Sequence, residues 1–268
     1  MLKTAVISAL TLFLSAATSF ALSEGSAVSP DQGKFSVGLE YNRIFDKDLS
    51  PKDNGAYRAM HVESSDQVYV VPAYGVYQTE RFKVGVLGKA GIANLKIEGE
   101  DAVSNIEKID YDMGFLWGLG GKAAYTFENN LILTVGAQYN EWYSDLDQAN
   151  YRGQLATTFI KRASATVSDF QAAILFSTIF KQPGREDVSY IPYIGPSVSA
   201  FNLNTGTVTY LTTGGLSRNN IQTGAHGDQH VGLILGLDVL TVSDTLRLNA
   251  ELRFIVETAL SLSIHYKF

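Results

Sequence analysis

Residues 246–268 read LRLNAELRFIVETALSLSIHYKF, and this stretch decides the fold class. Apolar side chains recur at every second position, which places them on one face of a strand. At about 3.3 Å per residue the stretch would extend roughly 75 Å, whereas a tilted membrane strand needs only about 9 to 11 residues. The stretch therefore predicts two antiparallel strands, joined by a turn at residues 257–259 that pairs Leu248 with Phe268.

The other end of the chain is typical of an export signal. Lys3 supplies a positive charge, residues 5–17 are mostly apolar, and Ser19-Phe20-Ala21 has the small-x-small pattern of a cleavage site. We therefore expect a cleaved signal peptide over residues 1–21 and a single barrel domain over residues 22–268.

The composition limits what this domain can be. After the signal, no apolar run is long enough for a membrane-spanning helix. The chain has 24 glycines, 14 tyrosines and 14 phenylalanines against 6 prolines, which fits strands with tight turns and aromatic belts. It has no cysteine, so disulfides and thiolate sites are excluded. A net charge of −6 without a basic patch argues against nucleic acid as a partner.

The remaining alternation predicts further hairpins, which have short turns on one side and long polar loops on the other. The pattern indicates an all-β, closed antiparallel up-and-down transmembrane β-barrel of about ten strands, with both termini on the short-turn side. An eight-stranded barrel with one hairpin outside the membrane is the alternative. Short turns are expected at residues 79–81, 128–130 and 182–185, and long loops at residues 46–66, 98–111, 144–162 and 203–229.

Three segments carry a family resemblance: VGLILGLD at 231–238, LRLNAELRF at 246–254 and HYKF at 265–268. With the signal segment, they make the chain similar to small bacterial outer-membrane β-barrels of the OmpA/OmpW-like type. The resemblance implies location in the outer membrane of a Gram-negative cell, contact with its lipid, and recognition of the terminal Phe268 by the barrel-assembly machinery. The rival interpretation of Phe268 is an aromatic-girdle residue that ends a strand.

Strand parity also predicts which charged side chains face the lumen. Opposite charges in a low-dielectric barrel must be paired to offset their desolvation. The favoured interpretation is therefore that these side chains pair with one another and plug the lumen. The alternative is a selectivity ring in a narrow channel for ions or small solutes. The predicted lumen set is Glu40, Lys89, Lys122, Asp238, Arg247, Glu251 and Arg253.

The chain also contains residues of types that a hydrolase uses. Asp110 and Asp112, with Asp228 and His230, resemble the aspartate pair and the Asp–His pair of an omptin-like rim protease, in which an Asp-oriented His activates water. His226, His230 and Asp228 could also bind a divalent metal. Such residues are ordinary in polar loops, so we expect no catalytic site, no metal and no cofactor.

Aromatic residues near the predicted strand ends favour a membrane girdle, with Trp142 as an exception in parity. The sequence thus predicts a monomeric barrel with a structural or surface-interaction role, in which four long outer loops contact an extracellular ligand that the sequence does not identify. The proposed girdle comprises Trp117, Tyr125, Phe127, Trp142, Tyr143, Tyr266 and Phe268.

Overall fold

The computed structural model describes residues 30–52, 57–101, 103–182, 185–227, 230–241, 245–255 and 257–268. The predicted signal peptide lies outside these residues, so its cleavage stays a prediction. Within the described residues, no helix is both long and apolar enough to cross a membrane.

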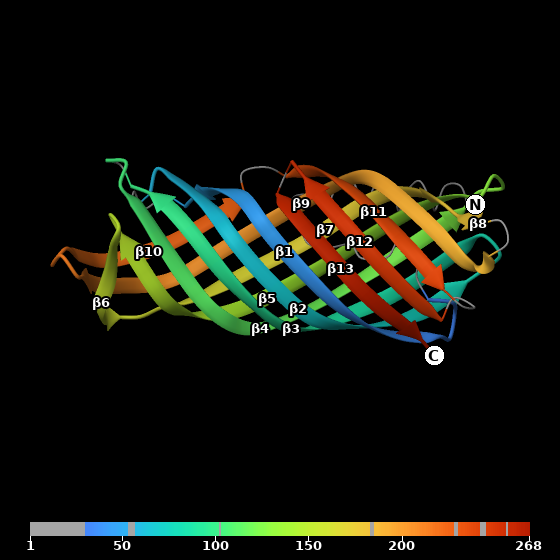
Figure 1. The fold of residues 1–268 in the computed structure, drawn as a ribbon, viewed down its shortest axis with the longest axis horizontal. Helices are drawn as coiled ribbons and strands as arrows, with labels where there is room; N and C mark the ends of the chain where they lie inside the picture. Colours follow the sequence, from blue (N-terminus) through green and yellow to red (C-terminus); the bar gives the residue numbers. More distant parts are fainter. Residues whose placement is uncertain are drawn as a thin grey trace, which may run out of the picture.

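Ten antiparallel strands form a closed ring (Figure 1). Each strand pairs with the next along the ring, and the last pairs with the first, so no edge is left open in this part of the barrel. The described strands thus support ten, and the eight-stranded alternative is wrong. The ring consists of β1 (Phe35–Pro51), β2 (Ala59–Gln78), β3 (Phe82–Glu100), β4 (Ile106–Thr126), β5 (Leu131–Tyr151), β7 (Ser164–Thr178), β9 (Arg185–Thr212), β11 (Val231–Thr241), β12 (Leu246–Phe254) and β13 (Thr258–Lys267).

A second barrel section continues from one end of this ring. Here β10 (Ser217–Gly227) pairs with β9 on one side and with the end of β1 on the other, beyond the ends of β11 to β13. β6 (Gln154–Lys161) lies between β5 and β9. We call the ten-stranded part the membrane ring. The section made by β6, β10 and the far ends of β1 to β5, β7 and β9 is the loop-side barrel, on the left of Figure 1. The short β8 (Phe180–Gln182) lies at the other end.

The four predicted long loops are largely wrong, because most of their described residues are strand. β1 runs to Pro51 and β2 begins at Ala59, so little of the predicted loop 46–66 lies outside strands. The side chains alternate here as well: Met60 and Val62 are buried, whereas Glu63 is exposed. The outward face of these strand ends is polar because it meets water instead of lipid. This polarity made the composition of the segments look like that of loops.

The closing hairpin is present, but its register differs from the prediction. Leu248 pairs with Ile264, not with Phe268, and Arg253 pairs with Ala259. The turn is therefore centred two residues earlier than predicted. Ile255 takes a positive φ of 83°, and the Glu257 side chain is buried inside the barrel. Each side chain still lies on the predicted face of its strand, because the register is shifted by an even number of residues.

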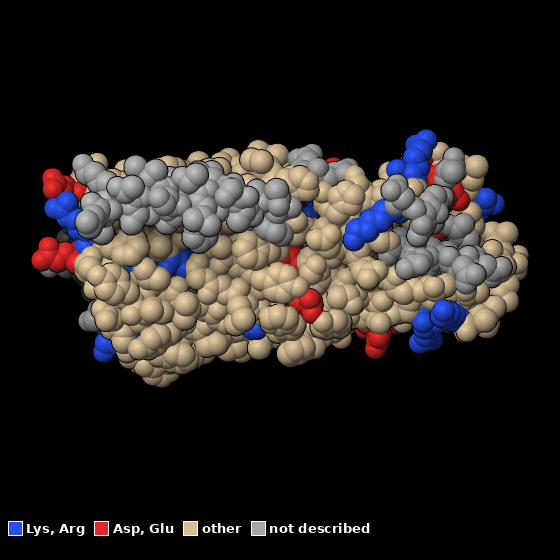
Figure 2. Space-filling view, turned by 180° about the vertical axis from the view of Figure 1, so that it is seen from behind, with Lys and Arg blue, Asp and Glu red and all other residues tan. Residues whose placement is uncertain are grey.

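An apolar belt surrounds the membrane ring. Leu235 on β11 and Leu119 on β4 point outward and are 47% and 63% exposed. Figure 2 shows charged side chains gathered toward the two ends and a broad middle with few of them. The nine residues from Leu260 to Phe268 span about 21 Å at a tilt of about 45°, close to the ~25 Å apolar band of an outer-membrane barrel.

Candidate functional site

The predicted lumen residues all face the interior of the membrane ring. Six of them are buried and Arg247 is half-buried. Their burial places these side chains on the inner side of the strands that carry them. They come from β1 (Glu40), β3 (Lys89), β4 (Lys122), β11 (Asp238) and β12 (Arg247, Glu251 and Arg253).

A chain of buried ion pairs begins where the ring meets the loop-side barrel. Lys47 Nζ lies 3.0 Å from Glu257 Oε2 and donates a hydrogen bond to Ser199 Oγ at 3.1 Å. Arg253 Nε lies 2.8 Å from Glu257 Oε1, and its Nη1 lies 3.1 Å from Glu251 Oε1. Each carboxylate thus has a cationic partner, which is the condition for burying charge at acceptable cost.

The same chain continues toward the short-turn end through neutral groups. Tyr193 donates a hydrogen bond of 3.0 Å to Glu251 Oε2 and accepts one of 2.8 Å from Asn249 Nδ2. Asn249 Nδ2 also donates to Asp238 Oδ1 at 2.7 Å. These bonds join the neighbouring strands β9, β11 and β12 along the inner wall of the ring.

A second cluster surrounds Glu40. Its Oε1 accepts hydrogen bonds from Tyr69 at 2.8 Å and from Ser261 at 3.1 Å, and Lys89 Nζ lies 3.6 Å away. The Lys89 ammonium also lies 4.5 Å from the centre of the Tyr69 ring. Asn42 extends the first chain of contacts to β2, because its Oδ1 accepts a bond of 2.6 Å from Arg253 and its Nδ2 donates one of 2.9 Å to Gln67 Oε1.

Sequence reasoning missed several members of this network. Lys47 fell in a predicted loop and Glu257 in a predicted turn. A register shift between Ile44 and Asp46 reverses the parity of β1, so Lys47 points inward although it is odd-numbered like the outward Leu39. No sequence signal marks this bulge.

The loop-side barrel has an apolar interior instead of a charged one. Trp142, the exception in parity among the aromatic residues, is fully buried, with its ring centre 6.0 Å from that of Phe201, and is not part of the girdle. The buried carboxylate of Glu107 accepts hydrogen bonds from the hydroxyls of Tyr57 and Tyr210, and that of Asp101 accepts one from Tyr151. This section resembles the core of a water-soluble barrel and covers the lumen. Other buried members are Leu49, Met60, Val62, Leu95, Ile97, Ile109, Leu116, Leu146, Val167, Leu203 and Val208.

The described residues of the predicted protease group do not come together. Asp110 on β4 lies at the protein surface, 3.1 Å from Lys96 Nζ. His230 precedes β11, and three ring strands, β5, β7 and β9, separate it from β4. Its Nδ1 lies 3.2 Å from the carbonyl oxygen of Ser199. Asp228 lies outside the described residues, and no group of three metal-ligating side chains occurs within them.

The two chain ends of the barrel meet at the short-turn end. The Phe268 N–H donates to the carbonyl of Phe35 at 2.9 Å, and the two rings lie 6.3 Å apart. The Phe268 ring also lies 5.0 Å from that of Tyr266. These contacts fit a girdle residue, and recognition of Phe268 by the assembly machinery stays a prediction.

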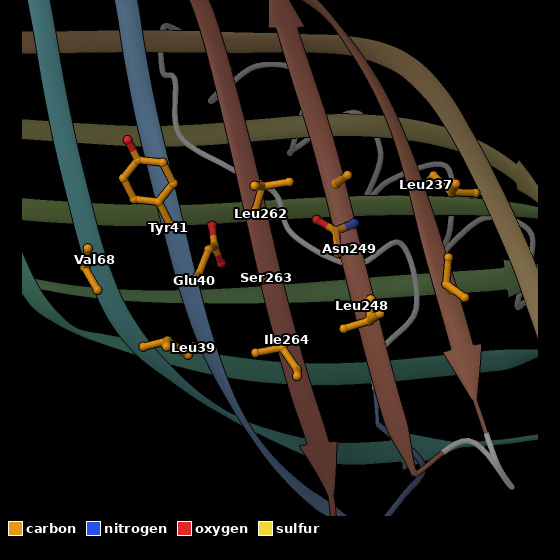
Figure 3. A pocket seen from close by; sticks show the side chains of 12 residues that line it. Leu39, Glu40, Tyr41, Val68, Leu237, Leu248, Asn249, Leu262, Ser263 and Ile264 are labelled. Carbon is orange, nitrogen blue, oxygen red and sulfur yellow. The ribbon is translucent and has the colours of Figure 1, made fainter.

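A shallow groove of about 490 Å³ lies on the lipid-facing side of the ring. Figure 3 shows Leu39, Val68, Leu248, Leu262 and Ile264 lining it from adjacent strands. The outward side chains of this lining belong to the apolar belt, and the buried Glu40 and Asn249 lie beneath them.

The comparisons with known proteins concern the fold alone. No protein-family model and no curated protein sequence matches the chain. Among solved structures, the outer membrane protease OmpT from Escherichia coli is 9% identical, with 91% of this chain and 100% of that chain covered and a TM-score of 0.51. The chain has the fold of a bacterial outer-membrane β-barrel. OprG from Pseudomonas aeruginosa is 11% identical, with 90% and 98% covered and a TM-score of 0.42.

Proposed function

We propose that this outer-membrane barrel is closed to solutes and acts by surface interaction through its loop-side barrel. The observation that carries the proposal is that buried side chains of the described residues extend through the interior of both sections. Paired charges occupy the lumen of the membrane ring, and an apolar core centred on Trp142 lies above them. Ions would have to cross both layers.

The orientation follows from the chain ends. Both ends of the barrel lie on the short-turn side, which faces the periplasm in outer-membrane barrels of even strand number. The loop-side barrel then projects outward beyond the lipid. Its outer surface is polar, with Lys108 between Glu63 and Glu98 at 3.1 and 2.8 Å. A folded, water-exposed surface of this kind suits contact with a partner, since binding residues concentrate on segments that a rigid scaffold positions.

The deciding experiment is single-channel recording of the refolded protein in a planar bilayer. We expect no discrete openings from protein shown to be folded by circular dichroism. The double variant Trp142→Ala/Phe201→Ala, which removes two large rings from the covering core, serves as a control that should conduct more often than the unchanged protein.

Reproducible openings of the unchanged protein would overturn the proposal and favour the narrow channel. In that case, neutralising Lys89 and Arg253 should alter the ion selectivity, because they are buried lumen cations.

A further inference from the structure

A short segment before β1 lies against the short-turn mouth of the barrel. We call residues 30–34 the strap. Gly33 N donates to the Gly75 carbonyl at 2.9 Å, and Gln32 and Gln78 exchange hydrogen bonds of 3.0 and 3.2 Å. A side chain at position 75 would run into the carbonyl of Asp31, so glycine permits this close approach.

The strap presents one carboxylate to two lysines of the barrel wall. Asp31 Oδ1 lies 2.6 Å from Lys83 Nζ on β3, and Oδ2 lies 3.0 Å from Lys267 Nζ on β13. Each carboxylate oxygen therefore has its own ammonium partner, and β1 and β2 lie between the two donor strands. Two further cations, Lys122 and Arg247, face the lumen from the strands adjacent to these two, β4 and β12.

We propose that Lys83 and Lys267 form a binding site for small phosphate or carboxylate anions, and that Asp31 is its built-in occupant. Two ammonium groups that each hold one oxygen of the same carboxylate have the arrangement that an external anion with two charged oxygens needs. The lysine side chains are 31% and 22% exposed and that of Asp31 is 37% exposed, so water and solutes reach them.

Exchange between the strap and an external anion is physically reasonable. Ion pairs this exposed are individually weak, so an anion of higher charge can compete with Asp31. Gly33, at a φ of +75°, lies between the strap carboxylate and β1 and gives the backbone a turning point. Binding of an anion would thus release the strap from the mouth. This site lies at the opposite end from the surface role proposed above and does not depend on it.

The test uses the absence of cysteine in the chain. An environment-sensitive fluorophore on Pro30→Cys reports whether the strap lies at the mouth or is released. Calorimetry measures binding of pyrophosphate and of citrate to the folded protein in detergent. We expect both anions to bind and shift the emission, whereas sodium chloride at equal ionic strength does not. Pyrophosphate alone would assign the site to phosphates, and citrate alone would assign it to carboxylates.

Asp31→Asn should bind the anions about tenfold more tightly, because the internal competitor is gone. Lys83→Met/Lys267→Met should lose binding. Lys34→Met serves as the matched control, since it removes a strap lysine whose ammonium does not contact Asp31, and should leave binding unchanged. Equal affinity of Asp31→Asn and the starting protein, or an equal response to sodium chloride, would overturn the proposal.

Discussion

At the scale of the residue, the buried carboxylate of Glu257 joins the two barrel sections. It is 1% exposed and holds both Lys47 and Arg253. Glu257→Gln should lower the free energy of unfolding by about 3 to 5 kcal/mol, because it takes the counter-charge from the buried Lys47 and one of two from Arg253. Urea unfolding in detergent micelles measures this loss.

A double variant shows whether the loss of stability in Glu257→Gln comes from the unpaired charge or from altered packing. Lys47→Met/Glu257→Gln removes one cation together with the anion, and Arg253 keeps its contact of 3.1 Å with Glu251. We expect the double variant to be more stable than Glu257→Gln alone. If the two losses simply added, the ion pair would not be the source of the effect.

The Asp31 carboxylate gives a pH dependence. Burial alone would raise its pKa, but hydrogen bonds from Lys83 and Lys267 outweigh it and lower the pKa from 3.8 to about 2. The folded-state pKa is depressed, so the stabilisation is complete above pH 3.8 and is lost as the pH falls toward 2. Its size should be at most ~1 kcal/mol at this exposure.

A label on Pro30→Cys, followed in an acid titration, should therefore report strap release between pH 4 and pH 2. Asp31→Asn should show no transition in this range. A transition that persists in that variant would point to another group.

At the scale of the element, a charge placed on the outward face of β11 tests whether the apolar belt lies in the membrane. Leu235 lies between the outward residues Leu252 and Ile194 on the neighbouring strands. Leu235→Arg should destabilise the barrel by about 2 to 4 kcal/mol if it lies near the bilayer midplane, because a charge there meets hydrocarbon. Refolding into lipid vesicles, followed by tryptophan fluorescence, measures the change.

Ile106→Arg is the control for this variant. Ile106 is 50% exposed, similar to Leu235, but it begins β4 in the loop-side barrel. Its replacement should be nearly neutral, since the added charge meets water. Equal costs at the two positions would contradict the boundary drawn between the two sections.

At the scale of the whole molecule, the two sections have opposite organisation. The membrane ring is apolar outside and charged inside, whereas the loop-side barrel is polar outside and apolar inside. Trp142→Ala should destabilise the loop-side barrel by about 3 to 5 kcal/mol, through lost burial and the cavity left behind. Limited proteolysis of protein in vesicles should then cleave the loop-side barrel first. Cleavage no faster than in the starting protein would show that Trp142 does not hold this section together.

The sequence by itself predicted the lipid-facing parity and the lumen set, and it favoured ten strands over eight. A period of two fixes which face of a strand each side chain takes, so Glu40, Lys89 and Glu251 could be assigned without coordinates. Alternation also required residues 246–268 to form two strands, because one strand would exceed the membrane thickness.

Only the tertiary structure decided register and partners. An even shift in register leaves every side chain on the same face, so the sequence could not distinguish Ile264 from Phe268, four residues later, as the partner of Leu248. A bulge in β1 turned the Lys47 side chain inward, and the alternation of the sequence does not mark it. The polar loops became a second barrel because their inward residues bury one another across strands distant in sequence. The convergence of Lys83 and Lys267 on Asp31 arises for the same reason: ring closure brings β13 back beside β1.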